Sequence, residues 1–317
     1  MEPIPLVCHP DYENALKGII AQLIKKHPRL SKVLYSATSE LASYGQDIQE
    51  IRRSWNFTDY SPYASTWPPP EVRRIILFRK FFCVPSWRNR RYTLIHEIGH
   101  HTIYDENKLP HLYKYSELLE QDLRGYLKSP HSYNPSNPIT PILATNPHKT
   151  YAILHFVQPL KLPDELGANE FVCKLEPRLF AWWLRKQLQL NIKRFQEIKQ
   201  IIRSGQQSVY NGCLSVNDII LYKSSLTLGV SDSLRKLANR ICKIHEHILH
   251  NCLNLQQIDD KDLFTYIDKF ISLAIDRKRA NEEITKIFEK YVQQFGHILT
   301  EIQVKPLQGI FLNLYRS

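Results

Sequence analysis

The chain has 317 residues, and 42 Lys and Arg against 31 Asp and Glu give it a formal net charge of +11. A composition of 43% hydrophobic and 23% charged residues excludes a wholly disordered or fibrous chain, and the length predicts one or two domains. With 10 glycines, the composition also argues against a glycine-rich phosphate-binding protein. The charge alone points to nucleic acid or an anionic membrane as a partner.

Cysteine usage and the N-terminus indicate a protein that folds in a reducing cytosol. The six cysteines occur singly and form no CxxC pair, which argues against a cysteine zinc ribbon. Met1–Ile20 lacks a basic patch followed by an apolar block, so no standard secretory signal peptide is predicted. No run of about 18 apolar residues occurs, so no membrane-spanning helix is expected. Translocation into a host cell cytosol by a signal-less secretion system stays open.

The first part of the chain is predicted to mix helix and strand. Apolar spacing predicts helices within residues 11–55, including a second periodic stretch at Leu34–Ile51. Residues 56–71 end in three prolines and are predicted to be a loop. The β-branched and aromatic content of Val72–Val84 predicts a strand, and residues 88–105 are predicted to be a helix.

The second part is predicted to be nearly all helical. Residues 128–149 carry five prolines and are expected to form a long loop or lid, and the helical pattern resumes at Asp164 and continues to about Ser204. Three amphipathic helices are then predicted at Ser231–Cys252, Asp259–Ile275 and Arg279–Glu301. We therefore expect an α+β catalytic domain in residues 1–205, followed by an all-helical domain for substrate recognition or targeting in residues 206–317.

The motif that carries chemistry lies within the helix predicted at 88–105. His96-Glu97-x-x-His100 places two imidazoles four residues apart, on one face of a helix, where both can bind one Zn²⁺. Glu97 lies about 100° around the helix from His96, so it flanks the metal and can take a proton from the attacking water. Gly99 leaves room for close backbone packing.

A second histidine cluster fails the same test. His245, His247 and His250 lie close together in sequence, but the position four after His245 is Leu249. A polar helix face is the expected role of His247 and His250.

A catalytic zinc takes a third protein ligand, and three acidic residues compete for that role. Asp105 and Glu106 follow the motif closely, and Glu165 lies far downstream. Glu106 is six residues after His100, where metzincins place their third ligand, but that geometry needs a chain turn and Ile103 stands where a glycine would serve it. The residues alone leave all three candidates open.

A short segment after the motif resembles a known family. Following the His-Glu-Ile-Gly-His sequence at 96–100, Glu165-Leu-Gly-Ala-Asn169-Glu-Phe-Val resembles the second motif of the ImmA/IrrE-type metallopeptidases, which are gluzincins. The resemblance covers roughly residues 72–178 and implies a zincin-like catalytic domain with one Zn²⁺ per chain. It implies that His96, His100 and Glu165 bind the metal and that Asn169 orients a metal-binding histidine.

Substrate binding can be assigned only in outline. The edge of the strand at 74–82 could pair with an extended substrate, and the basic residues near it (Arg73, Arg74, Arg79 and Lys80) would favour an acidic stretch. The developing oxyanion needs one further hydrogen-bond donor. The sequence does not choose among its candidates, which are Tyr104, Tyr113, Tyr115, His131 and His148.

The sequence thus predicts a zinc-dependent endopeptidase acting on a protein. The single His-Glu-Ile-Gly-His motif near residue 96 and the composition of the chain resemble those of RavK-like effector metalloproteases of Legionella. This resemblance implies a host cytoskeletal substrate such as actin. The alternatives are a regulatory ImmA/IrrE-like protease acting on a DNA-binding repressor, and a non-enzymatic adaptor whose C-terminal helices bind a partner or a membrane. No helix-turn-helix signature occurs, and Ser86–Arg91 is the one basic stretch interleaved with aromatics, so nucleic acid is not an expected partner.

Overall fold

The computed structural model describes residues 3–39, 64–67, 74–83, 86–107, 158–203, 210–254 and 260–300. The chain divides into two compact units. The first contains the described residues up to 107 together with Gly167–Phe180, and the second contains residues 158–166 and the described residues from Ala181 onward. The boundary predicted near residue 205 separates a catalytic domain from a recognition or targeting domain, and this division by function stays a prediction.

A four-stranded sheet forms the centre of the first unit. Its strands are β1 (Ile4–Val7), β2 (Leu34–Ser36), β3 (Ala64–Trp67) and β4 (Arg74–Leu77), in the order β2-β1-β4-β3. Strand β1 pairs in parallel with β2 and β4, whereas β3 pairs antiparallel with β4. Every residue of β1 and β4 is buried, which is typical of parallel strands covered on both faces.

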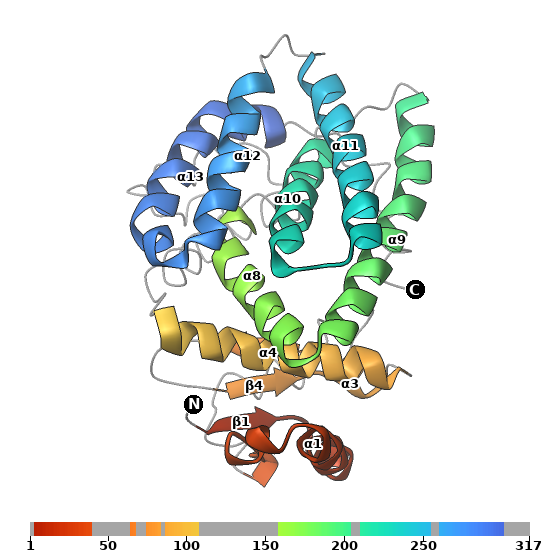
Figure 1. Ribbon diagram of the computed structural model, residues 1–317, viewed down its shortest axis with the longest axis vertical. Coiled ribbons are helices and arrows are strands. Elements are labelled where there is room, and N and C mark those ends of the chain that lie inside the picture. Colours follow the sequence, from red (N-terminus) through yellow and green to blue (C-terminus); the bar gives the residue numbers. More distant parts are fainter. Residues whose placement is uncertain are drawn as a thin grey trace, which may run out of the picture. The chain divides into compact units, whose positions relative to one another are not determined.

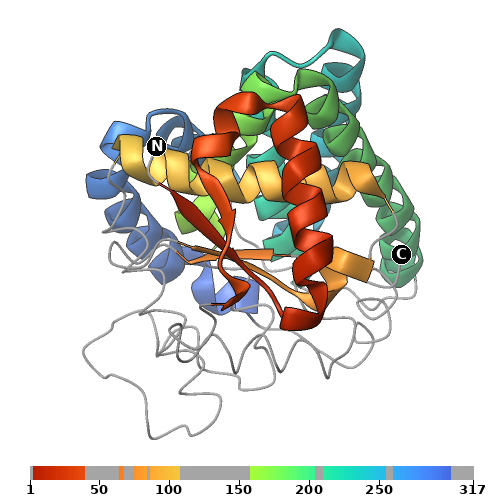
Figure 2. The ribbon, with the colours of Figure 1, turned by 90° about the horizontal axis from the view of Figure 1, so that it is seen from below.

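Helices cover both faces of this sheet. Helix α1 (Glu13–Lys26) lies on one side and helix α4 (Trp87–Asn107) on the other (Figures 1 and 2). In α1 the buried residues recur at helical spacing and face the sheet; they are Leu16, Ile19, Ile20 and Leu23. Short 3₁₀ turns flank α1 at Pro10–Tyr12 and Pro28–Lys32. The helices predicted at the start of the chain and at 88–105 are confirmed in α1 and α4.

Two short strands correct the sequence-based assignment. Leu34–Ser36, predicted to start a second helix, forms β2 because its backbone pairs with Ile4–Leu6 of β1. Ala64–Trp67, predicted to be loop, forms β3 because it pairs with Arg74–Leu77. Both segments have four residues or fewer, so tertiary pairing outweighs their local pattern. The rest of the predicted stretch, from residue 40 to 51, lies outside the described residues.

The strand predicted over Val72–Val84 is also shorter than expected. It ends at Leu77, and Arg79–Cys83 forms the short helix α3, in which Phe81 and Phe82 are both buried. The Phe82 ring packs against Tyr12, with ring centroids 4.6 Å apart. A short apolar run does not by itself distinguish strand from buried helix, and here the helix places two consecutive aromatic side chains in the core.

Helix α8 (Gln158–Leu175) crosses from the second unit into the first without a break in the helix. Helix α9 (Pro177–Arg203) follows after a single residue, so the helical stretch predicted from Asp164 to Ser204 is confirmed as two helices. Pro177 begins α9, and proline suits the first position of a helix because the N–H that it lacks would have no partner within the helix there.

The later helices belong to the second unit. The three predicted amphipathic helices are confirmed as α11 (Asp232–Asn254), α12 (Asp260–Ile275) and α13 (Arg277–Thr300). Helix α10 (Tyr210–Ser225) was not predicted; it contacts α11, α12 and α13 and is followed by a 3₁₀ turn at Leu226–Leu228. The core between α12 and α13 is aromatic and contains Phe270, Phe288, Tyr291 and Phe295.

The described residues are therefore mostly helical, with one small mixed sheet near the N-terminus. This agrees with the predicted α+β region followed by a helical region. Among the helices described, none is both long and apolar enough to cross a membrane. The predicted loop or lid at 128–149 lies outside the described residues.

Candidate metal centre

Helix α4 carries the His-Glu-x-x-His motif with its backbone buried in the first unit. Leu94, Ile95 and Ile98 are fully buried and fix the helix against its neighbours. His96 is half-buried, whereas Glu97 and His100 are 9% and 6% exposed. The three apolar residues thus lie on one side of the helix, and the three polar residues of the motif lie on another.

Two hydrogen bonds hold α4 against the elements before it. The Nε2 atom of His101 donates to the backbone carbonyl of Arg74 in β4 at 3.0 Å. The Nη2 atom of Arg90 donates to the carbonyl of Phe82 in α3 at 2.7 Å. Arg74 was predicted to favour an acidic stretch of substrate, but it is only 6% exposed, so little of it is accessible from the surface.

Gly99 is the point of closest approach between α4 and α8. A Cβ atom at this position would stand 2.9 Å from both the Cα and the carbonyl oxygen of Ala168, and 3.1 Å from the Cβ of Phe171. Real Cβ atoms do not approach backbone so closely, so only glycine allows this crossing. The predicted role of Gly99 in close backbone packing is confirmed.

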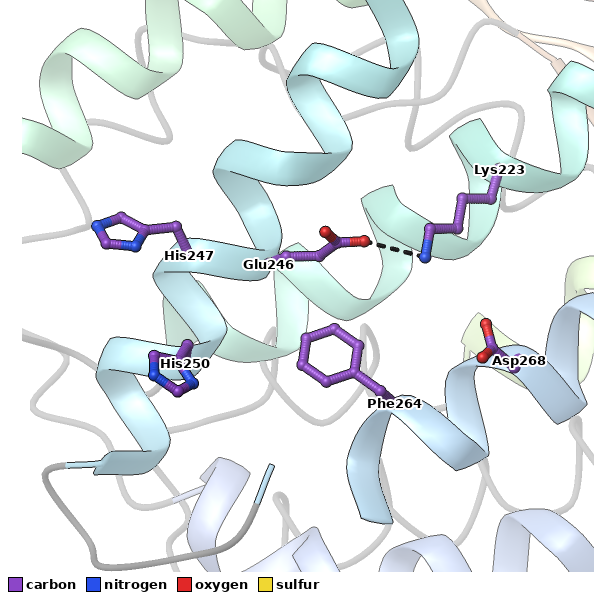
Figure 3. Close-up of a pocket in the computed structure, with 6 residues that line it drawn as sticks. All are labelled: Lys223, Glu246, His247, His250, Phe264 and Asp268. Carbon is purple, nitrogen blue, oxygen red and sulfur yellow. Dashed lines mark ion pairs between the residues drawn. The ribbon is translucent and has the colours of Figure 1, made fainter. Parts of the chain in front are cut away.

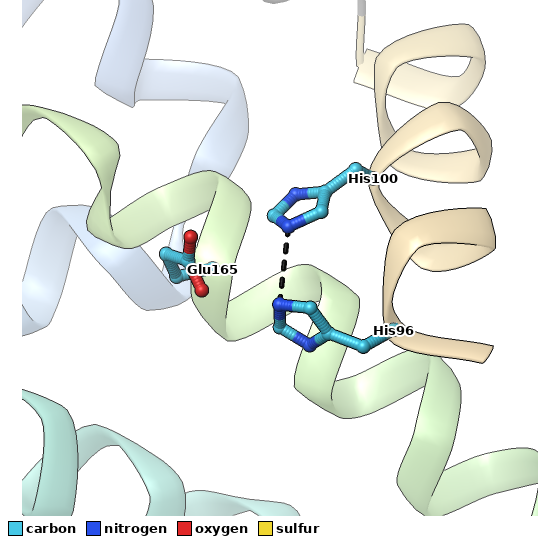
Figure 4. A group of neighbouring side chains, drawn as sticks. All are labelled: His96, His100 and Glu165. Atoms are coloured by element: carbon cyan, nitrogen blue, oxygen red, sulfur yellow. Dashed lines mark hydrogen bonds between the residues drawn. The ribbon is translucent and has the colours of Figure 1, made fainter. Parts of the chain in front are cut away.

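The crossing places Glu165 opposite the two histidines. Side-chain ligand atoms of His96, His100 and Glu165 all lie within 4.8 Å of one another (Figure 4). Glu165 lies one helical turn before Ala168, on the same unbroken helix. Within the described ranges, no other group of three His, Cys, Asp or Glu comes this close together.

The other two acidic candidates stay on the motif helix. Helix α4 continues through Asp105 and Glu106 to Asn107, so no chain turn follows His100. Both residues therefore continue along the helix axis, away from the turn that carries His96 and His100. Glu165 is the acidic candidate whose described side chain lies close to the histidines.

The donor set suits a zinc ion. The Nε2 atoms of His96 and His100 are 3.1 Å apart, and their rings meet edge to face at 85°. Two nitrogen ligands at 2.0–2.1 Å from a tetrahedral ion stand about 3.3 Å apart, so a small movement would let both bind one ion. Two imidazoles and one carboxylate, with a fourth position left for solvent, are the protein ligands of one common class of catalytic zinc site.

The sequence missed Tyr92, although a signal for it was present. Tyr92 lies four residues before His96, on the same face of α4, and its ring stacks on the His96 ring with centroids 5.6 Å apart. Its hydroxyl donates to Oδ1 of Asn169 at 2.5 Å. Asn169 was predicted to orient a metal-binding histidine; its hydrogen bond goes to Tyr92, which in turn contacts His96.

A second carboxylate in this unit is held by cations. Glu176 accepts hydrogen bonds from Lys26 at 2.5 Å and His27 at 2.7 Å, and Arg91 lies 3.0 Å away. Burial by itself raises the pKa of Glu176, but these hydrogen bonds and the charge of Arg91 together lower the pKa below its ordinary value. Glu176 therefore joins α1, α4 and the start of α9 as an ionised structural anchor.

The basic stretch Ser86–Arg91 is used within the fold. Arg91 pairs with Glu176, Arg90 bonds the carbonyl of Phe82, and the Arg91 guanidinium lies 6.0 Å from the ring centroid of Trp87. Arg88 is the exposed arginine of this stretch. Two of the three arginines in the stretch that most resembled a nucleic-acid-binding segment thus make contacts within the protein.

The candidates for an oxyanion donor stay predictions. Tyr104 lies in α4, one turn beyond His100, at a position where only the helix itself is described. The other four lie outside the described residues, namely Tyr113, Tyr115, His131 and His148.

Among the residues that the structure describes, the second histidine cluster joins no group of three potential metal ligands. His245 is fully buried and lies 3.3 Å from Asp218, whereas His247 and His250 are exposed, as expected for a polar helix face. The two exposed histidines line a surface pocket of about 460 Å³ together with Lys223, Glu246, Phe264 and Asp268 (Figure 3). Glu246 points to Lys223, with which it forms an ion pair at 2.9 Å, and not to the histidines.

Cys8, Cys83, Cys173 and Cys242 are free thiols and are not among the residues of the candidate metal group. Burial raises the pKa of Cys8 to about 11 and that of Cys242 to about 12, so both stay protonated near neutral pH. Neither Cys8 nor Cys242 is therefore suited to act as a nucleophile.

The candidate centre consequently rests on side chains of two crossing helices. Helix α4 supplies two imidazoles and a neighbouring carboxylate, and α8 supplies a second carboxylate and a buried amide. Comparison with known proteins adds no relative, since no family model, no curated protein and no solved structure matches the chain.

Proposed function

We propose that the chain is a zinc-dependent endopeptidase of the zincin type that hydrolyses peptide bonds of a protein substrate. The observation that carries this proposal is the grouping of His96, His100 and Glu165 within 4.8 Å of one another, with Glu97 beside them on α4. Three such ligands with a neighbouring glutamate are what a hydrolytic zinc site requires.

Each residue of the group has a separate task. His96, His100 and Glu165 hold the metal, and zinc, when bound, polarises the scissile carbonyl and makes water more acidic. Glu97 takes the proton from the attacking water and passes it to the leaving amine. Because Glu97 is 9% exposed, its carboxylate acts in an environment where solvent screens its charge only weakly.

An extended substrate segment needs a free strand edge with which its backbone can pair. The sequence assigned this role to the strand around residue 75, but β4 has neighbours on both sides and cannot accept another strand. Strand β3 is the last strand on that side of the described sheet, and it contacts α4. We therefore propose that a substrate segment pairs with β3, by strand addition to the sheet edge.

The deciding experiment compares the wild-type protein with Glu97→Gln. Both are incubated with a cytosolic extract and with purified actin, and new protein N-termini are identified by mass spectrometry. We expect new termini from the wild type, a rate lowered by roughly 10²–10⁴-fold in Glu97→Gln, and equal bound zinc in both. New termini produced equally by both proteins would contradict the proposal.

A further inference from the structure

Two columns of side chains face each other where α4 and α8 cross. Tyr92, His96 and His100 follow one another at intervals of four residues on α4 and share one helix face. Glu165 and Asn169 show the same interval on α8. The metal group joins one end of the two columns, and the hydrogen bond between Tyr92 and Asn169 joins the other.

This hydrogen bond is deeply buried and well defined. The Tyr92 hydroxyl donates to Oδ1 of Asn169 at 2.5 Å, and the two residues are 7% and 1% exposed. Removing one partner would leave the other polar group in a site with little access to water. The bond therefore resists local sliding of one helix along the other.

The same tyrosine also limits the orientation of a proposed ligand. Its ring lies nearly parallel to the His96 ring, at an interplanar angle of 22° and a centroid distance of 5.6 Å. Any rotation of the Tyr92 ring away from Asn169 would change the surface on which His96 rests. Metal-binding imidazoles depend on such outer partners for their orientation, and loss of a partner costs 10–100-fold in metal affinity.

From these contacts we infer that Tyr92 is a positioning residue, which, anchored by Asn169, holds His96 in the orientation that binds the metal. The inference rests on the proposed function, because it concerns the zinc ligands named there. It assigns Asn169 an indirect role: its amide oxygen fixes Tyr92, and Tyr92 fixes the imidazole. Tyr92 itself does not touch substrate or metal in this assignment.

The test measures zinc affinity of the full-length protein by competition with a chelator, together with the absorption spectrum of the Co²⁺-substituted protein. Tyr92→Phe keeps the ring but removes the hydroxyl, and Asn169→Leu removes the acceptor. We expect each variant to bind zinc about 10-fold more weakly and to shift the Co²⁺ bands. The double variant should lose little more than either single one, because both remove the same hydrogen bond.

Two further variants separate positioning from general stability. Tyr222→Phe is the matched control, since Tyr222 is a buried tyrosine that also bonds an asparagine, Asn191, but in the second unit. It should reduce the unfolding temperature without changing zinc affinity. Asn169→Asp keeps an acceptor oxygen for Tyr92 and should restore affinity to near the wild-type value.

The outcomes distinguish this inference from the proposed function. If the wild type binds zinc and Tyr92→Phe binds it equally well, the positioning role is wrong and the zinc site stands. The same conclusion follows if Tyr222→Phe weakens zinc binding as much as Tyr92→Phe does. If the wild-type protein binds no zinc, the proposed function fails and the positioning role fails with it.

Discussion

The α4–α8 crossing and the α10–α11 contact both contain histidines and carboxylates, yet they are built differently. At the α4–α8 crossing, two imidazoles and one carboxylate converge within 4.8 Å of one another. At α10–α11, each side chain has a separate partner: His245 pairs with Asp218, and Lys223 pairs with Glu246. Converging ligands suit a metal, whereas separate pairs suit stability.

The physical cause of the difference is spacing combined with close backbone approach. His96 and His100 are four residues apart and share a helix face, whereas His245 is buried and His247 and His250 are exposed. Gly99 then allows α8 to come close enough for a carboxylate from the second helix to join the pair. The number of histidines therefore does not decide whether potential ligand atoms come together; the spacing of the histidines and the approach of the facing helix do.

The largest expected effect is the loss of bound zinc in His100→Ala, from about one ion per chain to almost none, because two ligands do not hold the metal tightly. In contrast, His245→Ala should keep its zinc and lose about 2–4 kcal/mol of unfolding free energy, because it empties a fully buried site beside Asp218. Elemental analysis and thermal denaturation give the two readouts. Full zinc in His100→Ala would remove the proposed distinction between the two regions.

The next effect concerns the ligand on the facing helix. Glu165→Ala should weaken zinc binding by more than about 100-fold, a larger change than the loss of an outer partner produces. Asp105→Ala and Glu106→Ala should leave the affinity unchanged, because α4 continues as a helix through both positions. Chelator competition measures all three variants. Loss of affinity in either control, with none in Glu165→Ala, would place the third ligand on α4.

The third prediction concerns Glu176, a buried carboxylate of the first unit that we expect to stabilise the fold without affecting the metal. Glu176→Gln should lower the unfolding free energy by about 3 kcal/mol near pH 7, because Lys26, His27 and Arg91 lose their shared anion. Zinc affinity should not change. Urea denaturation of both proteins gives the difference in stability.

The pH dependence of that difference follows from the lowered pKa of Glu176. The ionised carboxyl contributes its stability above the pKa of an unfolded glutamate, about 4.3, and this contribution is lost as the pH falls through the lower pKa of the folded state. The difference in stability between the wild type and Glu176→Gln should therefore shrink as the pH falls below about 4.3. A constant difference from pH 7 to pH 3 would contradict the assigned ion cluster.

The smallest predicted effect probes the crossing itself. Gly99→Ala should cost about 1–3 kcal/mol of stability and weaken zinc binding, because its Cβ meets the Ala168 backbone at 2.9 Å. Gly18→Ala is the matched control: it lies inside α1, its Cβ meets nothing within 4 Å, and it should stabilise by roughly 0.5–1 kcal/mol. Equal behaviour of the two variants would mean that the crossing is less tight than described.

Strand assignment from the sequence succeeded only where the pattern was strong. The apolar run at Arg74–Leu77 indicated a strand and forms β4, but the run was extended too far, into the helix containing Phe81 and Phe82. The strands β2 and β3 have three and four residues, too short for a periodic signal. Such strands exist because a neighbouring strand supplies hydrogen bonds, which no local pattern records.

The sequence by itself determined the long helices and the spacing of the two histidines, because both follow from the 3.6-residue helical repeat. The sequence also indicated that Gly99 allows close packing, since a glycine within a helix often marks a close approach of another backbone. Only the tertiary structure brought Glu165 to the histidines, and only it linked Tyr92 to Asn169. These contacts join residues more than 60 positions apart, and chain spacing does not determine distances across such a separation.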